Sequence, residues 1–226
     1  IKRFMDLFVL PNMEDENARR RAEDELPQSA AGKTIMTTEP KFIPQEAASI
    51  MLADQSEIKV RLIDCVGFMV QGASGHMEGD ENRMVKTPWM EEEIPFVDAA
   101  RIGTEKVIRD HATIGIVVVT DGSIGELERD AYTEAEKTTI TKLEEIGKPY
   151  VVVLNSMRPY SEETRQLKDS LEKQYQTRVV PVNCQQMHRE DILHIMSAIL
   201  MEFPVTRIDY FIPKWTEMLP IEHPVK

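Results

Sequence analysis

Apolar and polar residues alternate over residues 58–63, Ile-Lys-Val-Arg-Leu-Ile, and this alternation predicts a half-buried strand. The strand ends at Asp64, and Gly67 follows shortly after it. A second segment, residues 41–52, predicts another strand, and the short polar stretch between the two favours an antiparallel pair. An Asp at the carboxyl end of an apolar strand lies at the rim of an α/β sheet, where such folds bind ligands. Asp and Gly are also common turn residues, so the strand end alone does not decide between a site and a turn.

The second half of the chain alternates between apolar strands and amphipathic helices. Residues 113–121 form a nearly continuous apolar run, which is typical of a strand buried on both faces. The pattern then predicts a helix at about 128–146, a strand at 150–155, a helix at about 161–176, a strand at 178–183 and a helix at 191–203. This repetition predicts an α/β fold with a doubly wound, mainly parallel sheet and helices on both faces.

Two helices are expected before the first strand. Ile1, Phe4 and Phe8 share one helical face, and Pro11 with the residue after it is expected to stop this helix. No capping residue precedes it, so we expect the given sequence to begin part-way along this helix. Residues 13–26 predict a second, mostly polar helix with a thin stripe of apolar residues.

The expected domain limits follow from composition. Residues 69–96 are rich in Gly, Glu and Met and predict an insertion, with a short strand or hairpin arm at 83–89. We expect one nucleotide-binding domain over residues 1–203. Residues 204–226 are expected to be a linker or the start of a following domain.

Charge and cysteine content narrow the possible functions. The 226-residue chain has a formal net charge of −12, which argues against nucleic acid as the main partner, because such binding depends on neutralising phosphates. Backbone N–H groups can still hold a small phosphate ligand. Cys65 and Cys184 sit at strand ends and are expected to be the reduced thiols of a cytosolic protein. No apolar run approaches the ~20 residues of a transmembrane helix, and no signal peptide is visible.

Polar residues stand at four predicted strand boundaries, in the order that GTPase-like P-loop proteins use. These are Thr37 and Thr38 before the first strand, Asp64 and Gly67 after the second, and Asn155 and Asn183 at the ends of two later strands. In such proteins the threonine region senses the γ-phosphate and Mg²⁺, the Asp holds Mg²⁺, and the Gly N–H approaches the γ-phosphate. The late strand ends frame the base. Asp64 and Thr38 are therefore the candidate metal residues.

Two positions depart from this pattern. A guanine-specific site uses an Asp acceptor after its Asn, whereas this chain places Arg158 after Asn155, and a guanidinium has no acceptor. Adenine is therefore the better prediction for the base. Phe68 stands where many GTPases have a Gln that orients water. Hydrolysis is expected to be slow unless another group, such as Thr37 or Thr38, orients that water.

At these residues the chain resembles the stage IV sporulation protein A family of endospore-forming bacteria. The resemblance is carried by residues 33–42, by Asp64-Cys65-Val66-Gly67-Phe68 and by Val153-Leu154-Asn155-Ser156, and it extends over essentially the whole chain. It implies a GTPase-derived, TRAFAC-type P-loop NTPase that hydrolyses ATP with Mg²⁺. It implies Thr37 and Thr38 for hydrolysis and Asp64 as the Walker B Asp. Together with the residues at the strand boundaries, this gives Asp64, Gly67, Asn155, Ser156 and Asn183 as the expected nucleotide contacts.

The resemblance also implies location and partners. Hydrolysis in the family drives polymerisation of the protein into the basement layer of the spore coat, in the mother-cell cytoplasm at the outer membrane surface of the forespore. The implied partners are further copies of the protein, spore coat proteins and a small amphipathic membrane peptide. The resemblance implies that the family's phosphate-binding loop would lie just before Ile1. Gly32-Lys33-Thr34 is not that loop, because Pro27 stands where the motif needs its first glycine. Further domains would lie beyond Lys226.

Two other functions stay open on sequence grounds. The protein is a structural scaffold if it binds nucleotide only to fold, or not at all, and Phe68 and Arg158 fit that function as well. A ribosome- or membrane-associated GTPase is the third possibility, which Arg158 disfavours. An intact Gly-x-x-x-x-Gly-Lys-Ser/Thr sequence ahead of Ile1 would favour the enzyme.

Overall fold

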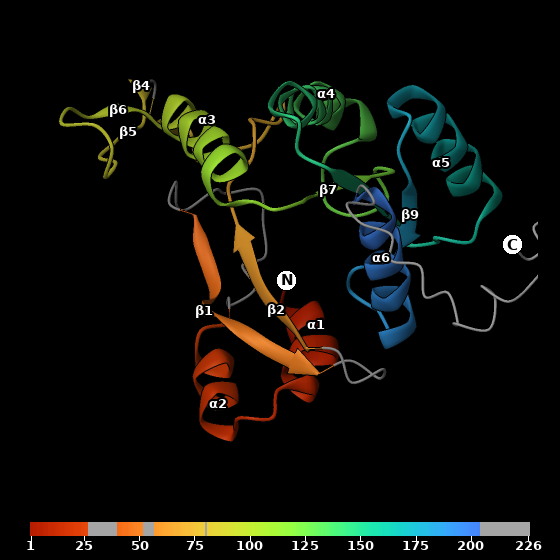
Figure 1. Cartoon of the computed structure of the whole chain (residues 1–226). Helices are drawn as coiled ribbons and strands as arrows, with labels where there is room; N and C mark the ends of the chain where they lie inside the picture. Colours follow the sequence, from red (N-terminus) through yellow and green to blue (C-terminus); the bar gives the residue numbers. More distant parts are fainter. Residues whose placement is uncertain (27–39, 52–56, 80, 204–226) are drawn as a thin grey trace, which may run out of the picture.

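Helices open the chain in the computed structural model, which describes residues 1–26, 40–51, 57–79 and 81–203 (Figure 1). An unbroken helical stretch consists of α1 (Lys2–Phe4), η1 (Met5–Val9) and η2 (Leu10–Asn12). It ends at the predicted stop, where the Asn12 side chain donates back to the carbonyl oxygen of Phe8 at 2.5 Å. Met5, Phe8 and Val9 are buried, so one face of the stretch belongs to the core.

Helix α2 (Glu16–Asp24) begins later than its sequence pattern predicts, because Asp15 is its N-cap. The Asp15 carboxylate accepts hydrogen bonds from the N–H groups of Asn17, at 2.8 Å, and Ala18, at 3.0 Å. These backbone donors, Ala18 first and then Asn17, hold the pKa of Asp15 below its ordinary value.

The predicted antiparallel pair is confirmed by β1 (Lys41–Met51) and β2 (Glu57–Asp64). Lys41 lies opposite Asp64, so the start of β1 and the end of β2 meet at one end of the pair. The register shifts between Ile43 and Ala48, which marks a bulge in β1.

The predicted parallel strands form a second sheet in the order β7 (Gly115–Thr120), β8 (Tyr150–Asn155) and β9 (Val179–Val182). Two crossover helices connect them, α4 (Arg129–Ile146) and α5 (Glu162–Tyr175). Each strand follows its predecessor in a parallel direction, as a β–α–β crossover requires. Thr120 lies opposite Asn155, and Asn155 opposite Val182, so the three carboxyl ends are level.

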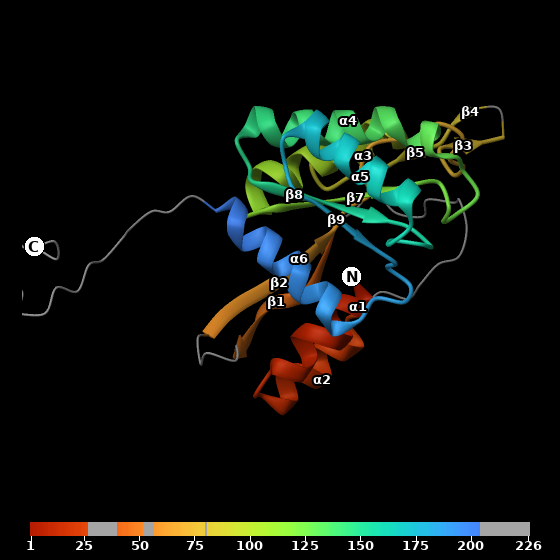
Figure 2. The ribbon, with the colours of Figure 1, turned by 90° about the vertical axis from the view of Figure 1, so that its right-hand side faces the viewer.

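Helices cover both faces of this parallel sheet, as predicted (Figure 2). On one face Val152 and Leu154 pack with the apolar residues of α4 and α5. On the other face Val151 and Val153 pack against α6 (Arg189–Glu202) and the amino-terminal helices, in a core that also includes the β1–β2 pair. Because side chains alternate along a strand, β8 contributes to both cores.

The sheet is nevertheless smaller than the sequence predicts. Within the described residues, β1 and β2 hydrogen-bond only to each other, and β7 pairs with β8 alone. Figure 1 shows the β1–β2 pair lying apart from β7. On β7, Ile116 and Val118 are exposed, at 38% and 60%, on the face opposite to the buried Val117 and Val119. Among the residues that the structure describes, no hydrogen-bond ladder joins the two sheets. They are held together instead by a shared core, in which residues of β1 and β2 pack with β8, α6 and the amino-terminal helices.

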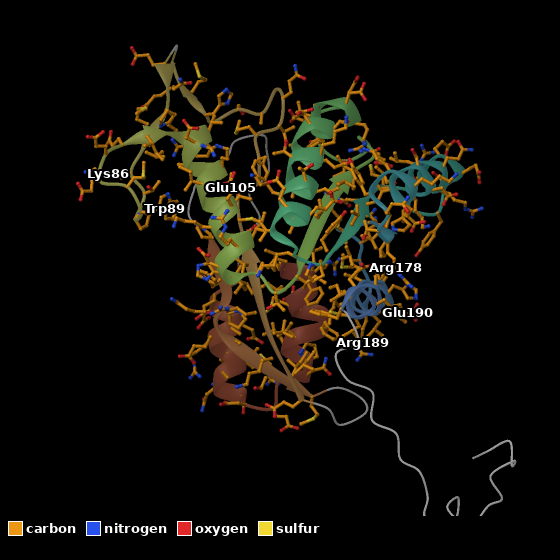
Figure 3. The ribbon with its side chains drawn as sticks, turned by 45° about the horizontal axis from the view of Figure 1, so that its top comes forward. Lys86, Trp89, Glu105, Arg178, Arg189 and Glu190 are labelled. Carbon is orange, nitrogen blue, oxygen red and sulfur yellow. The ribbon has the colours of Figure 1, made fainter. Side chains whose placement is uncertain are left out.

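The insertion forms short antiparallel pairs, as predicted for an arm. These are β3 (Met77–Glu78) with β4 (Glu81–Asn82), and β5 (Met84–Val85) with β6 (Ile94–Pro95). Lys86 and Trp89 project from the β5–β6 arm, on the opposite side of the molecule from Arg178 and Arg189 (Figure 3). The helical stretch α3 (Phe96–Lys106) and η3 (Val107–His111) then leads to the parallel sheet. Nowhere in the described ranges is a helix both long and apolar enough to cross a membrane.

Candidate nucleotide-binding site

Three of the predicted site residues meet at the carboxyl edge of the parallel sheet. Asn155 ends β8, and its Oδ1 accepts a hydrogen bond from the N–H of Cys184 at 3.0 Å. Ser156 donates its N–H to the carbonyl oxygen of Val182 at 2.9 Å. Asn183 follows β9 directly. The sheet therefore brings Asn155, Ser156 and Asn183 together, because parallel strands end at the same edge.

Ser156 has no exposed surface, and its hydroxyl is used inside the protein. Its Oγ accepts the N–H of Arg158 at 3.0 Å and lies 3.2 Å from the hydroxyl of Thr164 at the start of α5. The Thr164 hydroxyl in turn donates to the carbonyl oxygen of Arg158 at 3.0 Å. In this conformation Ser156 shapes the loop after β8 and does not reach a ligand with its own hydroxyl.

Asn183 is similarly engaged by its own loop. Its Oδ1 accepts the N–H groups of Gln185, at 3.0 Å, and Gln186, at 3.1 Å. Its Nδ2 lies 3.5 Å from the carbonyl oxygen of Met157, which makes a long hydrogen bond across to the loop after β8. Asn183 thus fixes the conformation of the loop that leads from β9 to α6.

Two residues of this edge were missed by the sequence analysis, Asp121 and Ser123 after β7. The N–H and hydroxyl of Ser123 both donate to the Asp121 carboxylate, and the same hydroxyl oxygen accepts the N–H of Met157 at 2.9 Å. Partial burial raises the pKa of Asp121, but hydrogen bonds from Ser123 and Ser156 outweigh it and hold the pKa below its ordinary value. The available signal was the same as at Asp64, an Asp that follows an apolar strand and precedes a Gly.

We call Asp121, Ser123, Asn155, Met157 and Asn183 the strand-end cluster. Its members come from the ends of all three parallel strands. The hydrogen bonds above join Asp121, Ser123, Met157 and Asn183, and the carbonyl oxygen of Asn155 accepts the N–H of Asp121 at 3.4 Å. The amino-terminal helix reaches the same edge, since the Arg3 guanidinium donates to the carbonyl oxygen of Gln185 at 2.8 Å and 3.2 Å. The start of the chain therefore lies beside the loop that follows β9 (Figure 2).

Asp64 and Gly67 lie at the end of the other sheet. Asp64 is exposed, and within the described residues it forms no hydrogen bond or ion pair with the strand-end cluster. Gly67 has a φ of +81°, which favours glycine, and its N–H donates to the hydroxyl of Thr104 at 3.2 Å. The predicted donor to a γ-phosphate is therefore bonded within the protein in this conformation.

The two thiols flank these regions. Burial raises the pKa of the Cys65 thiol, and burial also raises that of Cys184, so both favour the protonated form. Both cysteines are free, as predicted.

The predicted catalytic pair, Thr37 and Thr38, lies outside the described residues. A groove of about 840 Å³ opens between α2 and the β1–β2 pair, and its lining residues include Arg21, Glu25 and Glu46. It contains none of the predicted site residues, so it is not the candidate site.

Mg²⁺ does not require a site built from protein side chains alone. In the described ranges no group of three or more His, Cys, Asp or Glu side chains is placed to hold a metal ion. Mg²⁺ is usually bound through one or two carboxylates, with waters and substrate phosphates completing its octahedron. An exposed carboxylate such as Asp64 suits that role.

A parallel sheet covered by helices on both faces, with polar residues at its carboxyl edge, defines the class of α/β proteins that bind ligands at strand ends. The family model described as "Stage IV sporulation protein A, ATPase domain" matches residues 1–204, and the chain belongs to this family. The chain is a sporulation protein with an ATPase domain, which confirms the family resemblance found in the sequence.

Relatives from three species support this assignment. Stage IV sporulation protein A of Bacillus subtilis (strain 168) is 48% identical over 223 residues, covering 99% of this chain and 45% of that protein. The protein of the same name from Clostridioides difficile (strain 630) is 48% identical over 226 residues, covering 100% and 46%. The Bacillus anthracis protein is 47% identical over 223 residues. The chain thus spans less than half the length of these relatives.

Proposed function

We propose that the intact protein binds and hydrolyses ATP with Mg²⁺, and that hydrolysis drives its polymerisation into the basement layer of the bacterial spore coat. In this proposal the chain is a TRAFAC-type P-loop NTPase derived from GTPases. The support is the membership of residues 1–204 in an ATPase family together with the strand-end cluster. The proposed location is the mother-cell cytoplasm at the forespore surface. The proposed partners are other copies of the protein, spore coat proteins and a small amphipathic membrane peptide.

The observation that carries the proposal is the meeting of three loops and the amino-terminal helix at one sheet edge. Asn155 and Asn183 fix two of these loops, and Arg3 joins the helix to the second of them. In this proposal the phosphate-binding loop lies ahead of Ile1. A loop that enters the helix from that side would deliver phosphates toward the strand ends, where backbone N–H groups and a helix N-terminus favour them.

The proposed roles of the remaining residues follow from their chemistry. Asp64 would hold the Mg²⁺ shell, and the ion would supply charge neutralisation at the phosphates. Thr38 would contact the metal, and Thr37 would help to orient the attacking water. Arg158, exposed after the Asn155 loop, offers donors only, which disfavours the N–H groups of guanine and leaves adenine as the proposed base.

The proposal is tested by measuring ATP and GTP turnover of the full-length protein with and without Mg²⁺, beside the amount of sedimentable polymer. We expect Mg²⁺-dependent ATP turnover, slower GTP turnover, and polymer that forms only when ATP is hydrolysed. Equal or faster turnover of GTP would overturn the choice of base. If the intact protein did not turn over ATP, the proposal that it is an ATPase would be overturned.

A structural scaffold is the second candidate, and a specific observation favours it. Gly67 gives its N–H to Thr104, and Ser156 is buried, so two predicted nucleotide contacts are bonded within the protein. Phe68 adds no group that could orient water. In that case full-length protein would form the same polymer with a nonhydrolysable ATP analogue, or with no nucleotide.

A further inference from the structure

The loop after β8 holds one apolar side chain out at the carboxyl edge of the sheet. Met157 is 61% exposed, directly between the buried Ser156 and the exposed Arg158. A single exposed methionine needs no explanation on a protein surface. Met157 differs because its backbone is held from both sides by residues of the two neighbouring strand ends.

Three hydrogen bonds build this support. The N–H of Met157 donates to Ser123 Oγ at 2.9 Å, and the Ser123 hydroxyl donates onward to Asp121. The carbonyl oxygen of Met157 faces Asn183 Nδ2 at 3.5 Å. Ser123 belongs to the loop after β7 and Asn183 to the loop after β9, so Met157 is fixed between them.

The bonds next to Met157 remove the remaining freedom of the loop. Ser156 is tied to Val182 through its N–H, and its hydroxyl accepts the N–H of Arg158. The carbonyl oxygen of Arg158 accepts from Thr164. The backbone is thus pre-organised, and among the described residues the Met157 side chain stays largely exposed at the candidate ligand-binding edge. Ordering such a loop in advance lowers the entropy cost of binding.

We infer that Met157 is a base-contacting residue, whose side chain packs against the face of the adenine of ATP, and that Ser123 positions it. A thioether is polarizable and makes favourable contacts with aromatic rings. It also carries no group that a base amine or ring nitrogen must satisfy. This inference rests on the proposed ATP function and adds to it a binding residue and a positioning residue.

The test compares ATP affinity of full-length variants in the presence of Mg²⁺. Met157→Ala is expected to weaken ATP binding about five-fold, since it removes one apolar contact to the base. Met157→Leu keeps the apolar contact and is expected to bind ATP as the wild type does. Affinity for inorganic tripolyphosphate, which has no base, is expected to be the same in all three proteins.

Tyr160→Ala is the matched control. Tyr160 is 79% exposed in the same loop, but in the described part of the chain no hydrogen bond ties it to the ends of β7 or β9. We expect Tyr160→Ala to leave ATP affinity unchanged. Ser123→Ala is expected to weaken ATP binding less than Met157→Ala and to leave tripolyphosphate affinity unchanged, which a general loss of folding would not do.

The outcomes separate this inference from the proposed function. Unchanged ATP affinity in Met157→Ala, with normal binding by the wild type, would overturn the inference and leave the ATP function standing. Equal losses of ATP and tripolyphosphate affinity in Met157→Ala would also overturn the inference, because the effect would then not depend on the base. Failure of the wild-type protein to bind ATP would overturn both.

Discussion

Glu136 shows how one buried carboxylate joins two helices. It is 5% exposed on α4, pairs with the guanidinium of Arg129, and accepts the hydroxyl of Tyr175 from the end of α5 at 2.8 Å. Burial and the bond to Glu136 raise the pKa of Tyr175 above its ordinary value. A charge that is buried this far is retained only when it is paired and hydrogen-bonded.

The first prediction concerns Tyr175→Phe, which removes the hydroxyl and keeps the ring. We expect a loss of about 1 kcal/mol in the free energy of unfolding near pH 8, because Glu136 loses one buried hydrogen bond. Urea denaturation measures it, with Tyr160→Phe as a control in which an exposed hydroxyl is removed. An effect no larger than that of the control would contradict the role of the bond.

The same residue gives a prediction of pH dependence. Because the folded pKa of Tyr175 is raised, its contribution to stability is present below the unfolded pKa of about 10 and is lost as the pH rises above that value. We expect the wild type to lose stability progressively above about pH 10 on this account, as the pH rises toward the higher folded pKa of Tyr175. The loss should be smaller in Tyr175→Phe, and equal losses in both proteins would contradict it.

Residue identity alone predicted part of the candidate site. Asn155 and Asn183 were found because strand ends are visible as the limits of apolar runs. The burial of Ser156 was not predicted, since it depends on Thr164 at the start of the next helix. Ser123 was missed because a Ser after Asp-Gly has the pattern of an ordinary turn, and its bond to Met157 joins loops that are remote in sequence.

At the scale of elements, the loop from β7 to α4 is held by a close approach of backbone to backbone. Gly122 has a φ of +85°, and a Cβ there would lie 2.8 Å from the backbone nitrogen of Arg129. Gly147, which ends α4, has a φ of +72° but no atom within 4 Å of such a Cβ. Both glycines therefore have a left-handed backbone, but only Gly122 also lies too close to neighbouring backbone for a side chain.

Gly122→Ala and Gly147→Ala separate these constraints. Each is expected to cost roughly 1–2 kcal/mol for a left-handed backbone, and Gly122→Ala should cost more because its methyl group meets the backbone of α4. The free energy of unfolding from urea titrations measures both. An equal loss in the two variants would show that the contact with Arg129 relaxes without cost.

The sequence predicted these elements well because residues at their ends, such as a helix-ending glycine or the last residue of an apolar run, mark their limits. The strand 150–155 matched its bounds, and Gly147 marked the end of α4. The start of α2 was predicted too early, since capping by Asp15 competes with helix-forming residues around it. The separation of the two sheets depends on which strands lie side by side. The spacing of apolar residues along the chain does not indicate which strands pair with each other.

At the scale of the whole molecule, the proposed chemistry predicts a division between binding and turnover. Asp64→Ala in the full-length protein is expected to lower Mg²⁺-dependent ATP turnover by on the order of 100-fold. The fold should be unchanged, because Asp64 is exposed. Turnover and circular dichroism check this, with the exposed Glu57→Ala of the same strand as a control. Unchanged turnover that still requires Mg²⁺ would assign the metal to another residue.

The paired threonines give the complementary prediction. Thr37→Ala combined with Thr38→Ala, in the full-length protein, is expected to bind ATP nearly as the wild type does, because one or two neutral hydrogen bonds cost about 1 kcal/mol each. Turnover should fall much further, since these groups would act most strongly as charge develops. Binding, turnover and sedimentable polymer are measured together. Normal turnover would leave both threonines structural, and normal polymer without turnover would favour the scaffold.

The outer edge of β7 has a consequence for handling residues 1–226 as a separate preparation. Within the described residues, the edge of β7 away from β8 is unpaired, and Ile116 and Val118 leave an exposed apolar face beside it. Such an uncharged edge is a template for strand addition by another chain, a hazard that native proteins usually block with charge or cover. We expect concentration-dependent aggregation of this preparation by light scattering. Val118→Lys should suppress it, because it places a single positive charge on the exposed face beside that edge.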